Sequence, residues 1–443
     1  MLRAAEILEW LSHPDLNSDE LPMDLLAASA YQLAGFPARA AGILNSRTEF
    51  RSRSDILRPL LSGDFPGLFG ELAKRWAETP RNARDYVDIW SVNGKGEATW
   101  RRLVELESTS ALGVLCALMR WGSERRIDAA LGKLDAISGF MLNGRDRYSW
   151  LLAKLVSETC RTFVNTSLRS SLAWLSRELG ESGNIALERY LRQAYRSCKT
   201  QAWPSQKRGI ERLEAGNSFV LCTPTGSGKT TVAEIAILQR LFSVDYDITH
   251  DLPIAPLVIY LVPKRALAAE VEAKLLRTIS PLAQRKVVIT GLYGGIDWGP
   301  TDAWLANGER TVLICTYEKA EALLRFLGPL FLARLALIVL DEAQMIQFEG
   351  NTEDLRRGES RSLRLESLIA RLLVHVPEDQ CRVIGLSAVA YGIEDILSAG
   401  LPATINWVQP EQYIAALVNL SDGCNAGLIG DLTSATICSI ELT

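Results

Sequence analysis

The residue types that could carry chemistry are concentrated in a short glycine-rich segment. Residues 222–231 read Cys-Thr-Pro-Thr-Gly-Ser-Gly-Lys-Thr-Thr. Gly226 and Gly228 lack side chains, so the backbone N–H groups around them can approach an anion closely. Lys229 supplies a positive charge for the outer phosphates of a nucleotide, and Thr230 offers a hydroxyl to Mg²⁺. The segment therefore predicts a site for a nucleoside triphosphate and its magnesium ion.

The elements on either side of this segment favour the same interpretation. The apolar run 219–222 predicts a strand before it, and residues 231–241 predict a helix after it. The positive end of that helix would point at the phosphates. The G-x-x-x-x-G-K-[ST] pattern is met except at its first position, which is Thr223. We expect the nucleotide to be held by Thr225, Gly226, Ser227, Gly228, Lys229, Thr230 and Thr231.

A second apolar run ends in two acids. Residues 337–340 read Leu-Ile-Val-Leu and lead into Asp341 and Glu342. Asp341 could hold the metal together with Thr230, and Glu342 could orient or deprotonate an attacking water. A strand followed by Asp-Glu is common by itself, but it becomes specific downstream of a phosphate loop. We expect Lys229, Asp341 and Glu342 to act on the triphosphate.

A glutamine upstream could select the base. Residues 203–206 read Trp-Pro-Ser-Gln, and the amide of Gln206 can match both the donor and the acceptor on the adenine edge. The alternative is a glutamine exposed on a turn. Because the sequence contains no Asn-Lys-x-Asp guanine motif, ATP is the expected nucleotide.

The pattern of predicted secondary structure changes near residue 200. Beyond it, helical stretches alternate with short apolar runs at 219–222, 257–262, 287–290, 311–316, 335–340 and 383–386. Such alternation is typical of a parallel sheet with helices on both faces. Ligands of such sheets bind at the carboxyl ends of the strands, which is where the motifs above lie. The predicted fold is an α/β domain of this type, preceded by an all-α region.

The N-terminal region is predicted to be helical throughout. Residues 22–45 indicate a helical hairpin that breaks at Gly35, and residues 150–163 carry an apolar stripe at helical spacing. Seven tryptophans lie here, at positions 10, 76, 90, 100, 121, 150 and 174. We interpret them as core anchors, with stacking on nucleic-acid bases as the alternative.

Net charge, cysteine and histidine content and the lengths of apolar runs exclude several classes of protein. The net charge of −4 gives no global electrostatic reason for a nucleic-acid partner, so such a site must be local. Eight cysteines without paired spacing predict buried free thiols, and three scattered histidines argue against zinc. Glu6 and Glu9 interrupt any signal peptide, and no run reaches the ~18 apolar residues of a membrane span. We expect a cytoplasmic protein without a membrane partner.

The motifs together resemble the first motor domain of a superfamily 2 helicase. Gln206 matches the adenine-reading motif, residues 223–230 the phosphate loop, and 341–344 (DEAQ) the DEAD/DEAH-type box. Three further segments resemble the first nucleic-acid contact motif, the second such motif and the linker motif of the family: 260–268 (YLVPKRALA), 315–325 (CTYEKAEALLR) and 387–389 (SAV). Within the superfamily, the superkiller and archaeal repair-helicase branch is the most similar. The resemblance covers roughly residues 200–395 and implies a RecA-like P-loop domain.

The resemblance also implies roles for residues at other strand ends. Nucleic-acid contacts would come from Lys264, Arg265, Thr316 and Arg325, and coupling between motifs from Gln344 and Ser387. Hydroxyls and basic side chains at strand ends are suitable partners for phosphates. The alternative for Lys264 and Arg265 is that they are solvated loop charges. The run 293–295 (YGG) could also approach a sugar-phosphate chain, although a hairpin turn would look the same.

Three departures from the family pattern limit what we expect. Gln344 replaces the Asp or His of the box, and Val389 replaces a threonine hydroxyl in the linker motif. The sequence also contains no Q-x-x-G-R-x-x-R run, the motif of the second motor lobe that supplies an arginine finger. Loss of such a finger can lower the rate by ~10³–10⁵. We therefore expect a chain that is incomplete for unwinding by itself.

These observations predict three regions: a helical accessory domain (1–198), a RecA-like ATP-binding lobe (199–395) and a connector or the start of a missing second lobe (396–443). The expected function is that of the ATP-binding lobe of an ATP-dependent helicase or translocase, which binds ATP, Mg²⁺ and single-stranded DNA or RNA. The alternative is a regulatory or scaffolding ATP-binding module that a separate chain completes.

Overall fold

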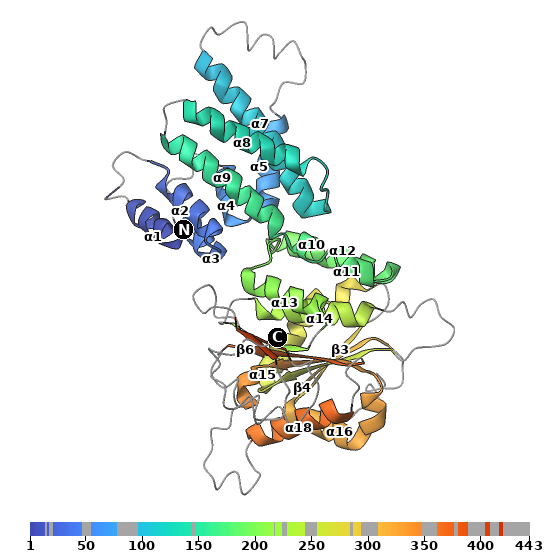
Figure 1. The fold of residues 1–443 in the computed structure, drawn as a ribbon. Coiled ribbons are helices and arrows are strands. Elements are labelled where there is room, and N and C mark those ends of the chain that lie inside the picture. Colours follow the sequence, from blue (N-terminus) through green and yellow to red (C-terminus); the bar gives the residue numbers. More distant parts are fainter. Residues whose placement is uncertain are drawn as a thin grey trace. The chain divides into compact units, whose positions relative to one another are not determined.

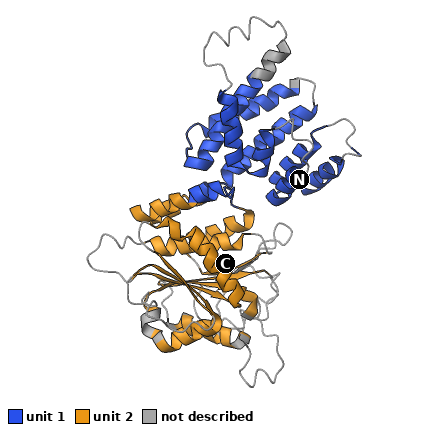
Figure 2. Cartoon of the chain, turned by 180° about the vertical axis from the view of Figure 1, so that it is seen from behind, with its two compact units in different colours: residues 1–171, 191–202 blue, residues 172–190, 203–443 orange. Residues whose placement is uncertain are grey.

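The chain divides into two compact units (Figure 2). Unit 1 comprises residues 1–171 and 191–202, and unit 2 comprises residues 172–190 and 203–443. The boundary that the sequence indicates, between residues 198 and 199, remains a prediction about folding domains. The computed structural model describes residues 1–13, 16, 21–46, 55–77, 96–143, 147–216, 218–223, 228–243, 255–283, 287–293, 309–346, 361–375, 380–388, 404–407 and 416–419.

Unit 2 is built around one sheet. Its strands are β1 (Phe219–Cys222), β2 (Leu257–Val262), β3 (Val288–Leu292), β4 (Thr311–Thr316), β5 (Leu335–Asp341), β6 (Arg382–Ser387), β7 (Thr404–Trp407) and β8 (Ala416–Asn419). Strands β1 to β6 pair in parallel in the order β3-β4-β2-β5-β6-β1. β8 and β7 extend the sheet beyond β1 in antiparallel pairing. The expected parallel sheet is confirmed.

Helices cover both faces of the sheet, as Figure 1 shows for α13 and α14 on one side and α16 and α18 on the other. The helices of this unit are α11 (Leu175–Glu178), α13 (Pro204–Glu214), α14 (Lys229–Phe242), α15 (Arg265–Thr278), α16 (Tyr317–Leu332) and α18 (Arg361–His375), with 3₁₀ turns η2 (Ser280–Leu282) and η4 (Ala343–Ile346). Every residue of β2 and β4 is buried. Burial on both faces is what a parallel sheet requires, and it explains why these strands are apolar runs rather than alternating patterns.

The strand positions follow the sequence closely. β1, β2 and β4 have the predicted bounds, whereas β3, β5 and β6 differ by one or two residues at their ends. β5 continues to Asp341 because the backbone of that residue pairs with Leu386 of β6. The pairing places the acid directly at the carboxyl edge of the sheet.

Unit 1 is helical, as expected. Its helices are α1 (Leu2–Leu11), α2 (Met23–Leu33), α3 (Pro37–Ser46), α4 (Leu57–Ser62), α5 (Phe65–Ala77), α7 (Gly96–Trp121), α8 (Ile127–Asn143), α9 (Arg147–Asn165) and α10 (Leu168–Ser171), and the boundary between the units falls within α12 (Glu181–Arg196). The predicted hairpin is α2 and α3, which pack together across Gly35 at φ +81°. Val156, Cys160 and Phe163 of the predicted stripe on α9 are buried in the core of the unit.

Two interpretations need correction. Trp174 is a buried anchor, but the side chains of Trp10, Trp76 and Trp121 are 66%, 52% and 52% exposed, so core anchoring is wrong for these three. An amphipathic pattern fixes which face of a helix is apolar but not whether a large ring at the rim of that face is covered. Five of the six described cysteines are buried free thiols, whereas Cys198 is exposed.

Among the described helices, none combines the length and the apolar character needed to cross a membrane.

Candidate nucleotide-binding site

The glycine-rich segment lies between β1 and α14, as predicted. Gly228 adopts φ +85°, a left-handed conformation that favours glycine, and α14 begins at the next residue. Thr230 and Thr231 lie in the first turn of α14 and are half-buried. Thr225, Gly226 and Ser227 lie outside the described residues.

Lys229 lies at the same edge of the sheet as the acids at the end of β5, which is separated from β1 by β6. Its ammonium Nζ donates a hydrogen bond to the backbone oxygen of Thr223 at 2.8 Å. Burial lowers the pKa of Lys229, and the Glu342 and Asp341 carboxylates act in the opposite direction. In a parallel sheet the carboxyl ends of all strands lie at one edge, and only residues 223–228 separate the end of β1 from the start of α14. The positive charge and both carboxylates therefore share one edge of the sheet, at the carboxyl ends of β1 and β5.

Gln206 is buried beside the same loop. It is only 7% exposed, so the alternative of an exposed turn glutamine is wrong. Its Oε1 accepts a hydrogen bond from the Trp203 backbone N–H at 2.8 Å, which caps α13, and its Nε2 donates to the Gly228 oxygen at 3.4 Å. An amide keeps one acceptor lone pair and one N–H beyond these bonds. Reading of adenine by Gln206 remains a prediction.

Asp341 is held by two tyrosines. The Tyr260 hydroxyl donates to Asp341 Oδ2 at 3.1 Å, and the Tyr317 hydroxyl donates to the Asp341 backbone oxygen at 2.9 Å. The Glu342 N–H donates to Asp341 Oδ1 at 3.0 Å. Burial raises the pKa of the Asp341 carboxyl, whereas the hydrogen bond from Tyr260 lowers it. Each carboxylate oxygen therefore has one protein donor that fixes its orientation.

Glu342 has an unusual backbone and a fixed side chain. Its φ is +53°, in the left-handed region that residues with a side chain rarely adopt. The Gln344 amide Nε2 donates to Glu342 Oε2, and the Gln344 Oε1 accepts from the Ser387 hydroxyl at 2.8 Å. Gln344 thus connects the acid at the end of β5 to the serine at the end of β6. A carboxylate could accept from Ser387 but could not donate to Glu342, so the glutamine makes a connection that an Asp in its place could not.

The comparisons with known proteins agree with this geometry. The family model described as DEAD/DEAH box helicase matches residues 203–396. These residues form a DEAD/DEAH box helicase domain. The Hachiman protein HamB of Bacillus cereus is 31% identical over 197 residues, which are 44% of this chain and 15% of that protein. The ATP-dependent DNA helicase Hel308 of Pyrococcus horikoshii is 30% identical over 203 residues, 43% of this chain and 24% of that protein.

Solved helicase structures align with about half of this chain. The Mycobacterium smegmatis helicase Lhr, bound to ssDNA and AMP-PNP, aligns with 50% of this chain and 26% of its own, at 23% identity and a TM-score of 0.37. The chain spans less than a quarter of the length of HamB and Hel308. The DEAD/DEAH box helicase match, residues 203–396, accounts for somewhat less than half of the chain.

Three of the four predicted nucleic-acid contacts gather at one edge of the helicase domain. Thr316 is the last residue of β4, and Lys264 and Arg265 follow β2 as the N-cap and first residue of α15. β2 and β4 are neighbours in the sheet, so these three residues lie at adjacent strand ends. Of the run 293–295, only Tyr293 is described. Its hydroxyl donates a hydrogen bond to Glu272 Oε2 at 2.5 Å. Contact of any of them with nucleic acid remains a prediction.

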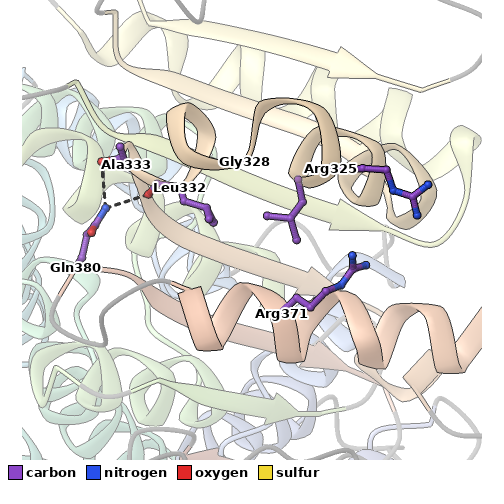
Figure 3. A pocket seen from close by; sticks show the side chains of 7 residues that line it. Arg325, Gly328, Leu332, Ala333, Arg371 and Gln380 are labelled. Carbon is purple, nitrogen blue, oxygen red and sulfur yellow. Dashed lines mark hydrogen bonds between the residues drawn. The ribbon is translucent and has the colours of Figure 1, made fainter.

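Arg325 lies apart from that edge. It is on α16, roughly 12 Å along the helix from Tyr317 at 1.5 Å per residue. Figure 3 shows it beside Arg371 of α18, at a cavity of about 600 Å³ that Gln380 also lines. Both arginines donate to Glu321 Oε1, at 3.4 Å and 3.2 Å. The structure therefore groups Arg325 with α18 rather than with Thr316.

The sequence pattern did not single out Tyr260 and Tyr317 as site residues. Tyr260 is fully buried in β2, and its pKa is raised well above the usual value by burial and by Asp341. A signal for it does exist: Tyr260 is the only residue of β2 with a side-chain hydroxyl. β2 lies next to β5, where residue 260 pairs with Val339, two residues before Asp341. Side chains two apart on a strand share a face, so register could have brought the hydroxyl to the acid.

The residues present fit a magnesium ion. Mg²⁺ is usually bound by one or two carboxylates together with water and substrate phosphates. Asp341 offers two oxygens that each accept one hydrogen bond, so each retains a lone pair for the metal or for its water. Thr230 places a hydroxyl in the first turn of α14. Asp341 and Thr230 are hard oxygen donors of the kind that the ion prefers.

Proposed function

We propose that this chain binds ATP with Mg²⁺ and a single strand of nucleic acid, as the ATP-binding lobe of a helicase or translocase. The observation that carries the proposal is that Lys229, directly after the left-handed Gly228 at the start of α14, and the acids Asp341 and Glu342 at the end of β5 lie at the same carboxyl edge of the parallel sheet. Lys229 would bind the outer phosphates, Asp341 and Thr230 would hold the metal, and Glu342 would orient the attacking water. When bound, Mg²⁺ would neutralise charge on the phosphates.

The polymer is proposed as single-stranded DNA or RNA. The relatives include proteins named as an ATP-dependent DNA helicase and as an ATP-dependent RNA helicase, so the family likeness does not choose between the two. Thr316, Lys264 and Arg265 would contact phosphates, because a hydroxyl and two basic groups lie at neighbouring strand ends. A cytoplasmic location is part of the same proposal.

We further propose that unwinding requires a second RecA-like lobe, supplied by a longer form of the protein or by a separate chain. The sequence has no second-lobe arginine motif, and the matched residues are only 15% of HamB and 24% of Hel308. If the isolated chain unwound a duplex with ATP, this part of the proposal would fail. If instead ATP binding altered assembly with a partner without hydrolysis, the regulatory or scaffolding role would be favoured.

Replacing Lys229 with alanine tests the nucleotide site. We expect affinity for a fluorescent ATP analogue with Mg²⁺ to fall about 100-fold, because truncating one partner of a buried charge pair costs about 2–5 kcal/mol. The measurement is fluorescence anisotropy of the analogue titrated with protein. The matched control is Lys207→Ala, an exposed lysine on α13, which should bind normally. Retained affinity in Lys229→Ala would place the nucleotide elsewhere.

Replacing Tyr260 with phenylalanine tests the metal site. We expect the Mg²⁺ concentration that supports analogue binding to rise about tenfold, because partners that orient a metal ligand typically change metal affinity 10–100-fold. Binding without Mg²⁺ should be unchanged. Tyr317→Phe is the control, since the Tyr317 hydroxyl bonds the backbone of Asp341 and not its carboxylate. An unaltered Mg²⁺ dependence in Tyr260→Phe would show that Tyr260 does not position Asp341.

A further inference from the structure

The turn between α7 and α8 in unit 1 combines an exposed ring with several arginines. Residues 120–126 read Arg-Trp-Gly-Ser-Glu-Arg-Arg. Trp121 is the last residue of α7, and 52% of its surface is exposed. Arg125 and Arg126 follow in the turn, and both are exposed. None of these residues belongs to the helicase domain, and the nucleotide site does not use them.

The indole of Trp121 is oriented although it is not covered. The Phe69 ring lies edge-on at 6.1 Å between centroids, with an interplanar angle of 82°. The Arg120 guanidinium lies 4.7 Å from the centroid of the Trp121 ring and 5.2 Å from that of Phe69. These contacts hold the ring without placing it in the core. A tryptophan in this state exposes apolar surface that folding alone would favour burying.

The end of α7 is contacted by Arg169. Gly122 has φ +72°, and the side chain of Arg169 lies against its backbone, so that a β-carbon at Gly122 would be 2.8 Å from Arg169 Cδ. The Arg169 guanidinium donates to the Arg120 backbone oxygen at 3.0 Å. Arg169 therefore satisfies a carbonyl at the end of α7 and adds a further positive group beside Trp121.

The charge of the turn is predominantly positive. Among the described residues, Arg125 and Arg126 form no ion pair, and neither do Glu124 and Asp128, the two acids of the turn and the start of α8. Four guanidinium groups (Arg120, Arg125, Arg126 and Arg169) thus outnumber two carboxylates in a chain whose net charge is −4. A basic turn on an acidic protein is a local electrostatic feature that favours a negatively charged partner.

Arg126 carries backbone strain. Its φ of +71° lies in the left-handed region, where an L residue other than Gly, Asn or Asp is uncommon. Glycine would adopt this conformation without strain. Strained residues that persist tend to lie at functional sites, where the side chain is needed in spite of the strain. At an exposed position outside the core, packing does not account for an arginine here.

We propose that this turn, residues 120–126 with Arg169, is a second binding site for single-stranded nucleic acid. The exposed face of Trp121 would stack on a base, and Arg125 and Arg126 would contact the flanking phosphates. A planar ring next to guanidinium groups matches the alternation of base and phosphate along a strand. Stacking is tolerant of sequence, so the site would add affinity without base specificity. It would act independently of ATP, because it lies in the helical unit.

The test measures binding of fluorescein-labelled oligothymidylate and oligouridylate to the full chain by anisotropy, without ATP and over a range of salt. Arg125→Glu/Arg126→Glu should weaken binding at least tenfold and reduce the slope of log affinity against log salt by roughly 1.4, at 0.7 per lost phosphate contact on a single strand. Trp121→Ala should weaken binding about 5–100-fold with little change in that slope, since it removes stacking and not charge.

Two further variants make the test specific. Arg3→Glu/Arg147→Glu reverses two exposed arginines elsewhere in unit 1 and should leave affinity nearly unchanged. Arg126→Gly should weaken binding while the midpoint of thermal unfolding stays equal or rises, a combination that a purely structural role would not produce. Equal losses in the Arg3/Arg147 control, or unchanged affinity in the Trp121 and Arg125/Arg126 variants, would overturn the proposal. The second of these results would leave an acidic protein as the partner of this turn.

The site can be separated from the helicase domain by the same measurement. In a Lys264→Ala/Arg265→Ala background, the residual affinity should still fall when Arg125 and Arg126 are reversed. If the background substitutions remove all binding, the turn contributes nothing and the inference fails, whereas the proposed contacts of the helicase domain would stand. If the Lys264→Ala/Arg265→Ala substitutions change nothing and the turn variants abolish binding, the inference stands and the proposed contacts of the helicase domain fail.

Discussion

Alanine in place of Gly228 is expected to weaken ATP binding at least tenfold. A β-carbon at Gly228 would lie 2.0 Å from Gln206 Nε2 and 2.9 Å from its Cδ, too close for either side chain to keep its place. The left-handed φ of +85° adds a conformational cost of about 1–2 kcal/mol for an L residue, and a shift of 1.4 kcal/mol towards a relaxed loop lowers the population of the binding conformation tenfold. Both effects displace the start of α14, from which Lys229 and Thr230 extend. The measurement is titration with a fluorescent ATP analogue.

Two variants separate collision from strain at this position. Gly63 also has a positive φ, +77°, but a β-carbon there meets nothing within 4 Å. Gly63→Ala should therefore lower the free energy of unfolding by about 1–2 kcal/mol and leave ATP binding intact. Adding Gln206→Ala to Gly228→Ala should recover part of the lost stability, because the colliding amide is removed. Full ATP affinity in Gly228→Ala would contradict the close contact of Gln206 with the loop.

Alanine in place of Gly385 is expected to destabilise unit 2 by about 1–3 kcal/mol, the usual range for overpacking. Gly385 pairs with Val220 of β1, and a β-carbon there would lie 2.8 Å and 3.1 Å from the two methyl carbons of that valine. Both partners are strand residues in the middle of the sheet, so neither can move aside without moving a strand. The measurement is the free energy of unfolding in urea.

The compensating and control variants follow from the same contact. Val220→Ala/Gly385→Ala should be more stable than the sum of the two single changes predicts, since the smaller side chain makes room. Gly132→Ala on α8 meets nothing within 4 Å and should raise stability by about 0.5–1 kcal/mol. Simple additivity of the Gly385 and Val220 changes would mean that the two residues are not in contact.

The sheet could be predicted from the sequence because its information is local. Runs such as 257–262 and 311–316 are apolar at every position, and a fully buried parallel strand requires that. The placement of Lys229 near Asp341 also follows from topology, because the carboxyl ends of parallel strands meet at one edge. The motif order then predicts which residues line that edge without knowledge of any distance.

The finer contacts could not be predicted because they depend on side chains far apart in the sequence. Gln344 bonds both Glu342 and Ser387, which requires the ends of β5 and β6 to lie at a fixed offset. The exposure of Trp121 depends on how α5 packs against α7. Arg325 was expected with Thr316 because both belong to one motif, but a helix carries residues of one motif progressively away from the strand end. The segments 224–227 and 389–403, which hold Ser227 and Val389, lie outside the described residues.

The left-handed backbone of Glu342 lowers the folding stability of the chain but places a carboxylate at the candidate site. Glycine or asparagine would occupy φ +53° with less strain, so selection for a durable fold alone would remove the acid. If Glu342 orients the attacking water as proposed, a domain with glycine or asparagine in its place should keep its fold and lose hydrolysis.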